Sequence, residues 1–202
     1  MPVSEPVTAR GRATRARIVQ AAAELVAERG AAATSLDEVG ARANASRSQL
    51  YHYFEDRDDL IRAVIDTTTN TVLAAQDELL SDLRSWDGID RWFAALNAIQ
   101  LQREARGGCP IGSLVGQLAE RDPLARAALA DGFDRWEGHL RNGLEVMQSD
   151  GFLLPDADPG QLATATMALL QGGLLLAQVR REPEQLRIAL NAARSLLRTA
   201  ST

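Results

Sequence analysis

Two short amphipathic segments joined by a tight turn, residues 35–54, constrain the fold of this chain more than any other feature. They read SLDEVGARANASRSQLYHYF. Ser35 stands three residues before Glu38, which is the spacing of a capping box at a helix N-terminus. The apolar positions that follow recur with helical spacing and share one face: Leu36, Val39 and Ala43. The first segment is therefore predicted to be a short helix with one buried side.

The second segment follows a predicted turn at Asn44, a residue type that tolerates the left-handed backbone. Ser46 is a good N-cap for a helix over 46–54, in which Leu50 and Phe54 face inward. The outward positions carry polar and aromatic side chains, namely Arg47, Ser48, Gln49, Tyr51, His52 and Tyr53. Arg and Gln make bidentate contacts with base edges, and hydroxyls reach phosphates. The pair of helices is therefore predicted to read DNA.

The rest of the chain keeps helical spacing, and no stretch alternates with period two. We expect an all-α fold of about nine helices. They are predicted over residues 14–29, 35–43, 46–54, 56–83, 89–105, 111–120, 123–149, 158–181 and 183–197, with a break at Asp87-Gly88 and a disordered segment over 1–9. We place an arm and a DNA-binding domain in 1–55, and a ligand-binding and dimerisation domain in 56–202.

Charge is distributed unevenly. The net charge of the 202 residues is −5, yet residues 1–53 hold seven Arg against five acidic residues, so the positive end coincides with the paired helices. Local potential decides DNA binding more than net charge does. The single cysteine cannot form an internal disulfide, no 18-residue apolar run predicts a membrane span, and the N-terminus does not resemble a secretory signal. We expect a cytoplasmic protein.

A basic arm, one helix and then TSLDEVGARANASRSQLYHYFEDRDDL closely resemble the N-terminal domain of the TetR family of bacterial repressors, over about residues 12–65. Two positions depart from the family pattern: Asn44 stands where glycine is usual, and Asp37 stands where some members carry a basic residue. The segment GGCPIGSL, residues 107–114, is similar to the LmrA/YxaF-like branch of the family. The resemblance implies a helix-turn-helix DNA-binding domain and a larger helical domain.

The same resemblance implies a ligand-responsive repressor, in which a homodimer binds a near-palindromic double-stranded operator and a small apolar effector releases it. No cofactor or metal is implied. Recognition-helix residues and their flanks then contact bases or phosphates, and Arg12 in the arm follows the backbone or enters the minor groove. The expected DNA contacts are Arg12, Ser35, Ser46, Arg47, Ser48, Gln49, Tyr51, His52, Tyr53 and Arg57.

Large apolar side chains and a few polar ones in the second domain are candidates for an effector pocket. An ordinary core is the competing interpretation for each of them. The candidates are Trp92, Phe93, Gln100, Cys109, Phe133, Trp136 and Met167. Cys109 also supports an alternative, a thiol that senses electrophiles, because it stands at the start of a predicted helix, where a thiolate is favoured.

A homodimer interface is predicted on the last two helices. Residues 161–179 are apolar or small around almost the whole circumference, so this helix must be covered on all sides. A buried core helix within one subunit is the alternative. The expected contacts are Leu169, Gly172, Gly173, Leu176, Leu186 and Leu190.

Two other classes of protein compete with a DNA-binding repressor. A small-molecule-binding helical protein without operator activity would not need Arg47, Ser48 and Gln49. An enzyme would need a nucleophile arrangement, a phosphate-binding glycine loop or a metal-ligand spacing, and the sequence shows none of these. We therefore predict a protein that is not an enzyme.

Overall fold

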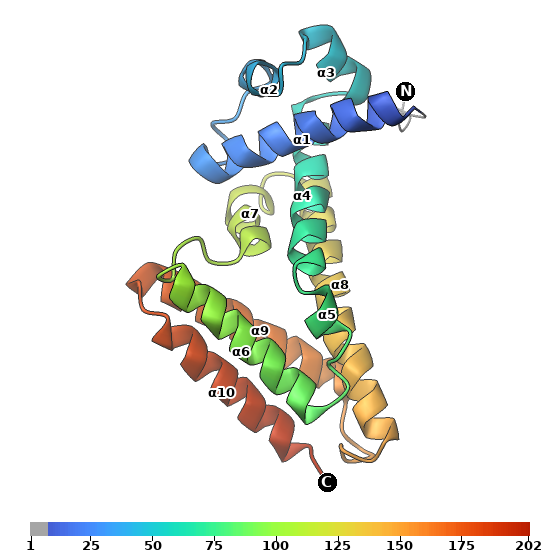
Figure 1. Cartoon of the computed structure of the whole chain (residues 1–202), viewed down its shortest axis with the longest axis vertical. Coiled ribbons are helices and arrows are strands. Elements are labelled where there is room, and N and C mark those ends of the chain that lie inside the picture. The colour runs from blue at the N-terminus through green and yellow to red at the C-terminus, as the bar shows by residue number, and fades with distance from the viewer. Residues whose placement is uncertain (1–7) are drawn as a thin grey trace. The chain divides into compact units, whose positions relative to one another are not determined.

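Helices account for nearly all regular structure in the computed structural model, which describes residues 8–202 (Figure 1). The all-α prediction is confirmed, although this part of the chain holds ten helices instead of nine. They are α1 Ala9–Arg29, α2 Leu36–Ala43, α3 Arg47–Tyr53, α4 Arg57–Ala74, α5 Asp77–Leu80, α6 Trp86–Gln102, α7 Pro110–Leu118, α8 Pro123–Ser149, α9 Pro159–Arg180 and α10 Glu184–Thr199. Residues 1–7 of the predicted disordered segment lie outside the described residues.

The first helix begins five residues earlier than the sequence predicts. Thr8 caps it by accepting a hydrogen bond from the Gly11 amide at 3.1 Å, and threonine is a favoured N-cap. Arg10 and Arg12 therefore lie on the first turn of α1, and the arm predicted there is wrong for these two residues.

Two compact units make up the chain, one formed by residues 1–72 with 113–132 and the other by 73–112 with 133–202. In the first, α1 packs on α2, and α2 on α3. Its core residues include Ile18, Leu25, Val39, Leu50, Phe54 and Leu60. Residues 56–72 belong to this unit by compactness, while the functional boundary at 55/56 stays a prediction.

The turn between α2 and α3 requires small or conformationally permissive residues at two positions. Asn44 adopts the left-handed conformation, φ 46° and ψ 51°, as its residue type indicates. A Cβ on Gly40 would lie 3.0 Å from the Ala45 carbonyl oxygen and 3.2 Å from Leu50 Cδ1. Glycine at position 40 therefore lets the two helices meet closely.

The helix predicted over 56–83 is interrupted. Asp56 does cap α4, since its Oδ1 accepts from the Asp59 amide at 2.7 Å, but α4 ends at Ala74. Gln76 lies between α4 and α5, is only 8 % exposed, and accepts a hydrogen bond from Trp92 Nε1 at 2.9 Å. This long-range bond satisfies the buried indole N–H, so tertiary contacts override the local helical pattern.

The break predicted at Asp87-Gly88 is also wrong, because both residues lie in the first turn of α6. Ser85 caps this helix by accepting from the Gly88 amide at 3.0 Å. A Cβ on Gly88 would lie 1.8 Å from the Asp82 carbonyl oxygen. This glycine thus permits a close backbone approach and does not end a helix.

The second unit is built around the packing of α9 on α10. A Cβ on Gly173 of α9 would lie 2.7 Å from Ala189 Cβ, so the two helices approach closely at this glycine. Arg194 of α10 donates from Nε and Nη2 to the two carboxylate oxygens of Asp90 on α6, at 2.5 and 2.7 Å. A bidentate pair of this kind fixes the orientation of α10 on α6.

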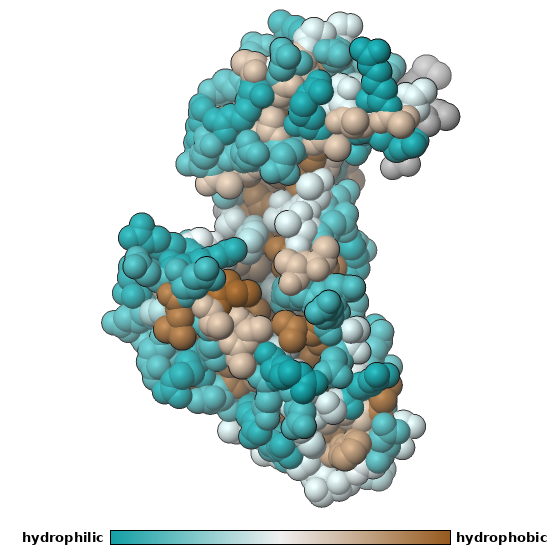
Figure 2. Space-filling view, viewed as in Figure 1, coloured by the Kyte–Doolittle hydropathy of each residue, from teal (hydrophilic) through white to brown (hydrophobic). Residues whose placement is uncertain are grey.

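Helix α9 is strongly apolar, although the sequence contains no uninterrupted apolar run of 18 residues at this place. Within residues 8–202 it is the one helix long and apolar enough to cross a membrane by length and composition. Apolar side chains reach the surface of the second unit, and some are visible in brown in Figure 2. Those on α9 are Leu175, Leu176 and Val179, which are 59, 45 and 73 % exposed.

Candidate nucleic-acid interface

Helix α3 is held at its N-terminus by a complete capping box. Ser46 Oγ accepts a hydrogen bond from the Gln49 amide at 3.3 Å, and Gln49 Oε1 accepts one from the Ser46 amide at 2.9 Å. A capping box satisfies two backbone donors reciprocally. Ser46 and Gln49, both predicted to contact DNA, thus also start the helix that presents them.

Arg47 and Tyr51 form a pair on the exposed face of α3. The Arg47 guanidinium lies over the Tyr51 ring, 5.8 Å from its centroid. A hydrogen bond with Tyr51 and the charge of Asp37 raise the pKa of Arg47, the hydrogen bond contributing most. The negative charge of Asp37, the residue that departs from the family pattern, therefore favours the charged form of Arg47.

The remaining predicted contacts on α3 divide into exposed and half-buried groups. Ser48 and His52 are exposed, whereas Tyr53 is half-buried against the core of the first unit. The His52 and Tyr53 rings meet edge to face, with centroids 4.8 Å apart. Helix α3 thus presents polar and aromatic side chains on its exposed side, while Leu50 is buried.

Several basic residues near this surface are committed to internal contacts. Arg17 of α1 donates from Nε to the Ala43 carbonyl at 2.8 Å, which ties α1 to the end of α2. Arg42 donates from both terminal nitrogens to Glu28, at 2.6 and 3.0 Å. Arg29 pairs with Glu38. These bonds fix α2 on α1 and leave the exposed part of α3 to define the surface.

Ser35 and Arg57, two further predicted DNA contacts, hold the scaffold together. Ser35 completes the capping box of α2, with its Oγ accepting from the Glu38 amide at 3.3 Å. Arg57 donates from Nε to the Thr34 carbonyl at 2.9 Å and from Nη2 to the Ala31 carbonyl. The sequence gives no signal for this second role, because the carbonyls are 23 and 26 residues away.

We expect Arg57→Ala to lower the free energy of unfolding by about 2 kcal/mol, since two charge-assisted hydrogen bonds to part-buried carbonyls are lost. Urea unfolding followed by circular dichroism measures the change. Arg10→Ala is a matched control, because Arg10 is an exposed arginine of the same unit. Equal stability of both variants would show that Arg57 is not structural.

In the second unit, most predicted effector contacts are buried. Trp92 is fully buried and Phe93 is 5 % exposed, with ring centroids 5.3 Å apart. Met167 is 5 % exposed, and Phe133 is half-buried. The indole N–H of Trp92 donates to Gln76, so this buried side chain needs no ligand and has the environment of a core residue.

Gln100 and Trp136 differ from these residues because each has a buried polar atom without a partner. Gln100 Oε1 and Trp136 Nε1 are buried and make no hydrogen bond with any described residue. Such an atom costs about 1–3 kcal/mol. Among the predicted effector contacts, these two side chains are therefore the ones that would gain from a polar group brought by a ligand.

Cys109 stands immediately before α7 and is 8 % exposed. Its Sγ accepts a hydrogen bond from the Gly112 amide at 3.3 Å. Burial nevertheless raises the pKa of the Cys109 thiol, against the opposing effect of the hydrogen bonds it receives. The helix start therefore does not produce the lowered pKa that a pre-activated sensor thiol needs.

We expect iodoacetamide to alkylate Cys109 in the native protein at pH 8 at least about tenfold more slowly than in urea, because the thiolate is the nucleophile. Since the native pKa is raised, the native rate should keep increasing with pH after the unfolded rate has levelled off. Mass spectrometry of timed samples measures both rates. Equal rates in the two states would revive the sensor alternative.

The predicted dimer contacts fall into two groups. Gly173, Leu186 and Leu190 are buried between α9 and α10 of the same subunit, so they are already covered. Leu169 is half-buried, Leu176 is exposed, and a Cβ on Gly172 would meet nothing within 4 Å. Leu175 and Val179 are not among the predicted contacts, yet both are exposed and extend this open stripe with helical spacing from Gly172.

Comparison with known proteins agrees with this architecture. Residues 18–64 match the family described as bacterial regulatory proteins, tetR family, and residues 86–193 match the tetracyclin repressor-like C-terminal domain. An HTH-type transcriptional regulator of Mycobacterium tuberculosis is 33 % identical over 190 residues, 91 % of this chain and 93 % of that protein. An HTH-type transcriptional repressor of the same species is 43 % identical over 131 residues, 65 % of each chain.

The solved structures give the same result at the level of the fold. The TetR-family regulator from Cytophaga hutchinsonii superposes with a TM-score of 0.80 at 16 % identity, covering 98 % of this chain and 99 % of that chain. The matched families are families of transcriptional regulators and not of enzymes. Taken with the capped helix-turn-helix and its exposed polar surface, these matches show that the chain belongs to the TetR family of bacterial regulatory proteins.

Proposed function

We propose that this protein is a cytoplasmic, operator-binding repressor that acts as a homodimer and is released by a small molecule. The surface of α3 carries the proposal, because its exposed side chains are those that read base edges and phosphates. Arg47, Ser48, Gln49, Tyr51 and His52 are the proposed contacts on this helix. Tyr53 at the end of α3 and Ser46 at its N-cap are further proposed contacts. The others lie outside this helix, namely Arg12, Ser35 and Arg57.

The proposed dimer uses the exposed apolar stripe of α9. Three exposed residues follow Gly172 at helical spacing, namely Leu175, Leu176 and Val179. They therefore share one face of α9 with Gly172, whose missing side chain permits close approach of a second helix. Burial of this stripe in a second copy also accounts for the apolar composition of α9 without a membrane. Two recognition helices must then lie about 34–36 Å apart to enter successive major grooves.

For the effector, we propose a small, mainly apolar molecule that carries a hydrogen-bonding group. Gln100 and Trp136 are the proposed hydrogen-bonding contacts, and Phe93, Phe133, Met167 and Cys109 are the proposed apolar contacts. Trp92 is assigned to the core. The helix α4 has residues in both compact units, so it is the proposed transmitter. Equal recognition-helix spacing in effector-bound and operator-bound crystals would overturn this mechanism.

A footprint of the purified protein on DNA flanking its own gene tests the function. We expect protection of a near-palindrome, and loss of protection when Arg47 and Ser48 are both replaced by Ala. Arg121→Ala serves as the control, since Arg121 is an exposed arginine far along the chain from α3. Absence of protection across this DNA and in a random-sequence selection at low salt would favour the alternative, a helical small-molecule-binding protein without operator activity.

A further inference from the structure

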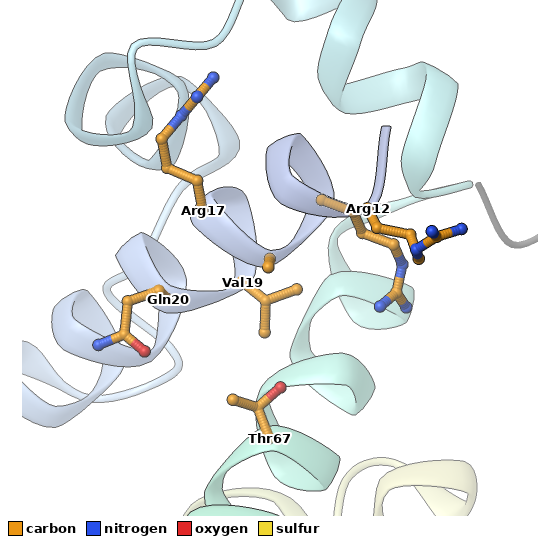
Figure 3. Close-up of a pocket in the computed structure, with 7 residues that line it drawn as sticks. Arg12, Arg17, Val19, Gln20 and Thr67 are labelled. Carbon is orange, nitrogen blue, oxygen red and sulfur yellow. The ribbon is translucent and has the colours of Figure 1, made fainter. Parts of the chain in front are cut away.

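A pocket of about 570 Å³ lies within the first unit, along α1 and against α4 (Figure 3). Its volume is in the range of small-molecule sites, about 300–1,000 Å³. Of the residues that line the pocket, only Arg12 is a proposed operator contact, and none is a proposed effector contact. The lining residues are Arg12, Arg15, Ala16, Arg17, Val19, Gln20 and Thr67.

One end of the pocket is positively charged. Arg12 and Arg15 lie three residues apart on α1, so their side chains are neighbours on one helical face. The Arg15 guanidinium lies over the Phe54 ring, 5.2 Å from its centroid, and this contact restricts its orientation. Arg12 also lies in the first turn of α1, where the helix dipole favours an anion. Arg17 contributes mainly its stem, since its Nε donates to Ala43.

The rest of the pocket is lined first by apolar and then by neutral polar side chains. In Figure 3, Val19 lies between Arg12 and Gln20, and Thr67 of α4 lies across from it. Val19 is 2 % exposed and forms an apolar base. Eight residues separate Arg12 from Gln20, which corresponds to about 12 Å of helix. The lining therefore suits an elongated molecule with an anionic head and an apolar body.

The position of Thr67 on α4 separates one side of the pocket from the proposed DNA-binding surface. Thr67 lies ten residues after Arg57, the first residue of α4, which places it about 15 Å along that helix. Since α3 directly precedes α4 in the chain, Thr67 is remote from the end of α4 that adjoins the recognition helix. A duplex phosphate could reach the exposed Arg12, whereas Thr67 lies along α4 away from the recognition helix.

We propose that this pocket binds an amphipathic organic carboxylate, with the carboxylate paired to Arg12 and Arg15 and the apolar body over Ala16 and Val19. Planar guanidinium groups match carboxylate geometry. Because Arg12 is also a proposed DNA contact, an occupied pocket withdraws positive charge from the operator surface. This regulatory consequence rests on the proposed function, whereas binding of the carboxylate does not.

Isothermal titration calorimetry of the full chain with sodium octanoate tests the binding. We expect saturable binding that weakens by about tenfold or more in the Arg12→Gln/Arg15→Gln variant, since both charge-assisted contacts are lost. Arg10→Gln should bind like the wild type, because it removes one positive charge from the same helix outside the pocket. Acetate lacks the apolar body and 1-octanol lacks the charge, so both should bind at least about tenfold more weakly than octanoate.

Three results would overturn the proposal: no binding of octanoate at millimolar concentration, equal binding of octanoate and 1-octanol, or equal affinity of the wild type and the double variant. Intrinsic fluorescence locates the site independently. All three Trp residues lie in the second unit, namely Trp86, Trp92 and Trp136, and both Tyr residues lie in the first. Octanoate that changes only Trp emission occupies the second unit, which also contradicts the proposal.

A separate measurement addresses regulation. Fluorescence anisotropy with a labelled operator should show weaker binding when octanoate is present, and the double variant should lose this effect. If octanoate binds as described but the protein binds no DNA, the pocket assignment stands and the repressor function fails. If DNA binds with unchanged affinity at saturating octanoate, the pocket stands without its regulatory consequence, and that consequence is withdrawn.

Discussion

Raising the salt concentration from about 50 to about 200 mM is expected to weaken operator binding by about a thousandfold or more. A dimer that neutralises about six to ten phosphates releases a corresponding number of condensed counterions, so the affinity falls steeply with salt. The effect should be large despite the net charge of −5, because residues 1–53 carry an excess of Arg over acidic residues. Fluorescence anisotropy across a salt series measures the slope.

Random-sequence DNA of equal length serves as the control in the same series. Its affinity should be lower at every salt concentration, while its slope should be similar or steeper, since phosphate contacts carry no sequence information. Arg12→Gln should reduce the slope by about 1 per subunit if Arg12 contacts a phosphate. A flat response for the wild type would contradict specific duplex binding.

Local rules predicted the elements near α3 well. The Ser35 capping box, the Ser46 N-cap and the left-handed Asn44 are set by residues within four positions of each other, so a single sequence contains all the information. The predicted start of α1 was wrong because the polar, arginine-rich residues after Thr8 resembled a disordered arm. In that case the cap was a stronger signal than composition.

Long-range contacts explain what the sequence could not provide. The end of α4 depends on the bond between Trp92 and Gln76, and the role of Gly88 depends on the Asp82 carbonyl that it approaches. The candidate site shows the same division. Exposure of Arg47 and Tyr51 follows from helical spacing, whereas the Arg57 bonds to distant carbonyls do not.

Gln49→Glu should separate helix stability from DNA recognition. Glutamate at this position keeps the acceptor that bonds the Ser46 amide, and a negative charge in the first turn is favoured by the helix dipole. The free energy of unfolding should therefore stay within about 0.5 kcal/mol of the wild type. Operator affinity should fall by about a hundredfold or more, because a dimer loses two base contacts of about 1–3 kcal/mol each.

Gln49→Ala provides the comparison that identifies the cause. Alanine loses the capping acceptor, so this variant should be less stable than Gln49→Glu by about 0.5–1 kcal/mol. It should nevertheless bind the operator better than Gln49→Glu, since it places no carboxylate beside the phosphates. Urea unfolding and anisotropy give the two rankings. If the two variants rank in opposite order for stability and for affinity, the Gln49 side chain both caps α3 and contacts the operator. If Gln49→Glu binds with wild-type affinity, Gln49 does not contact the DNA.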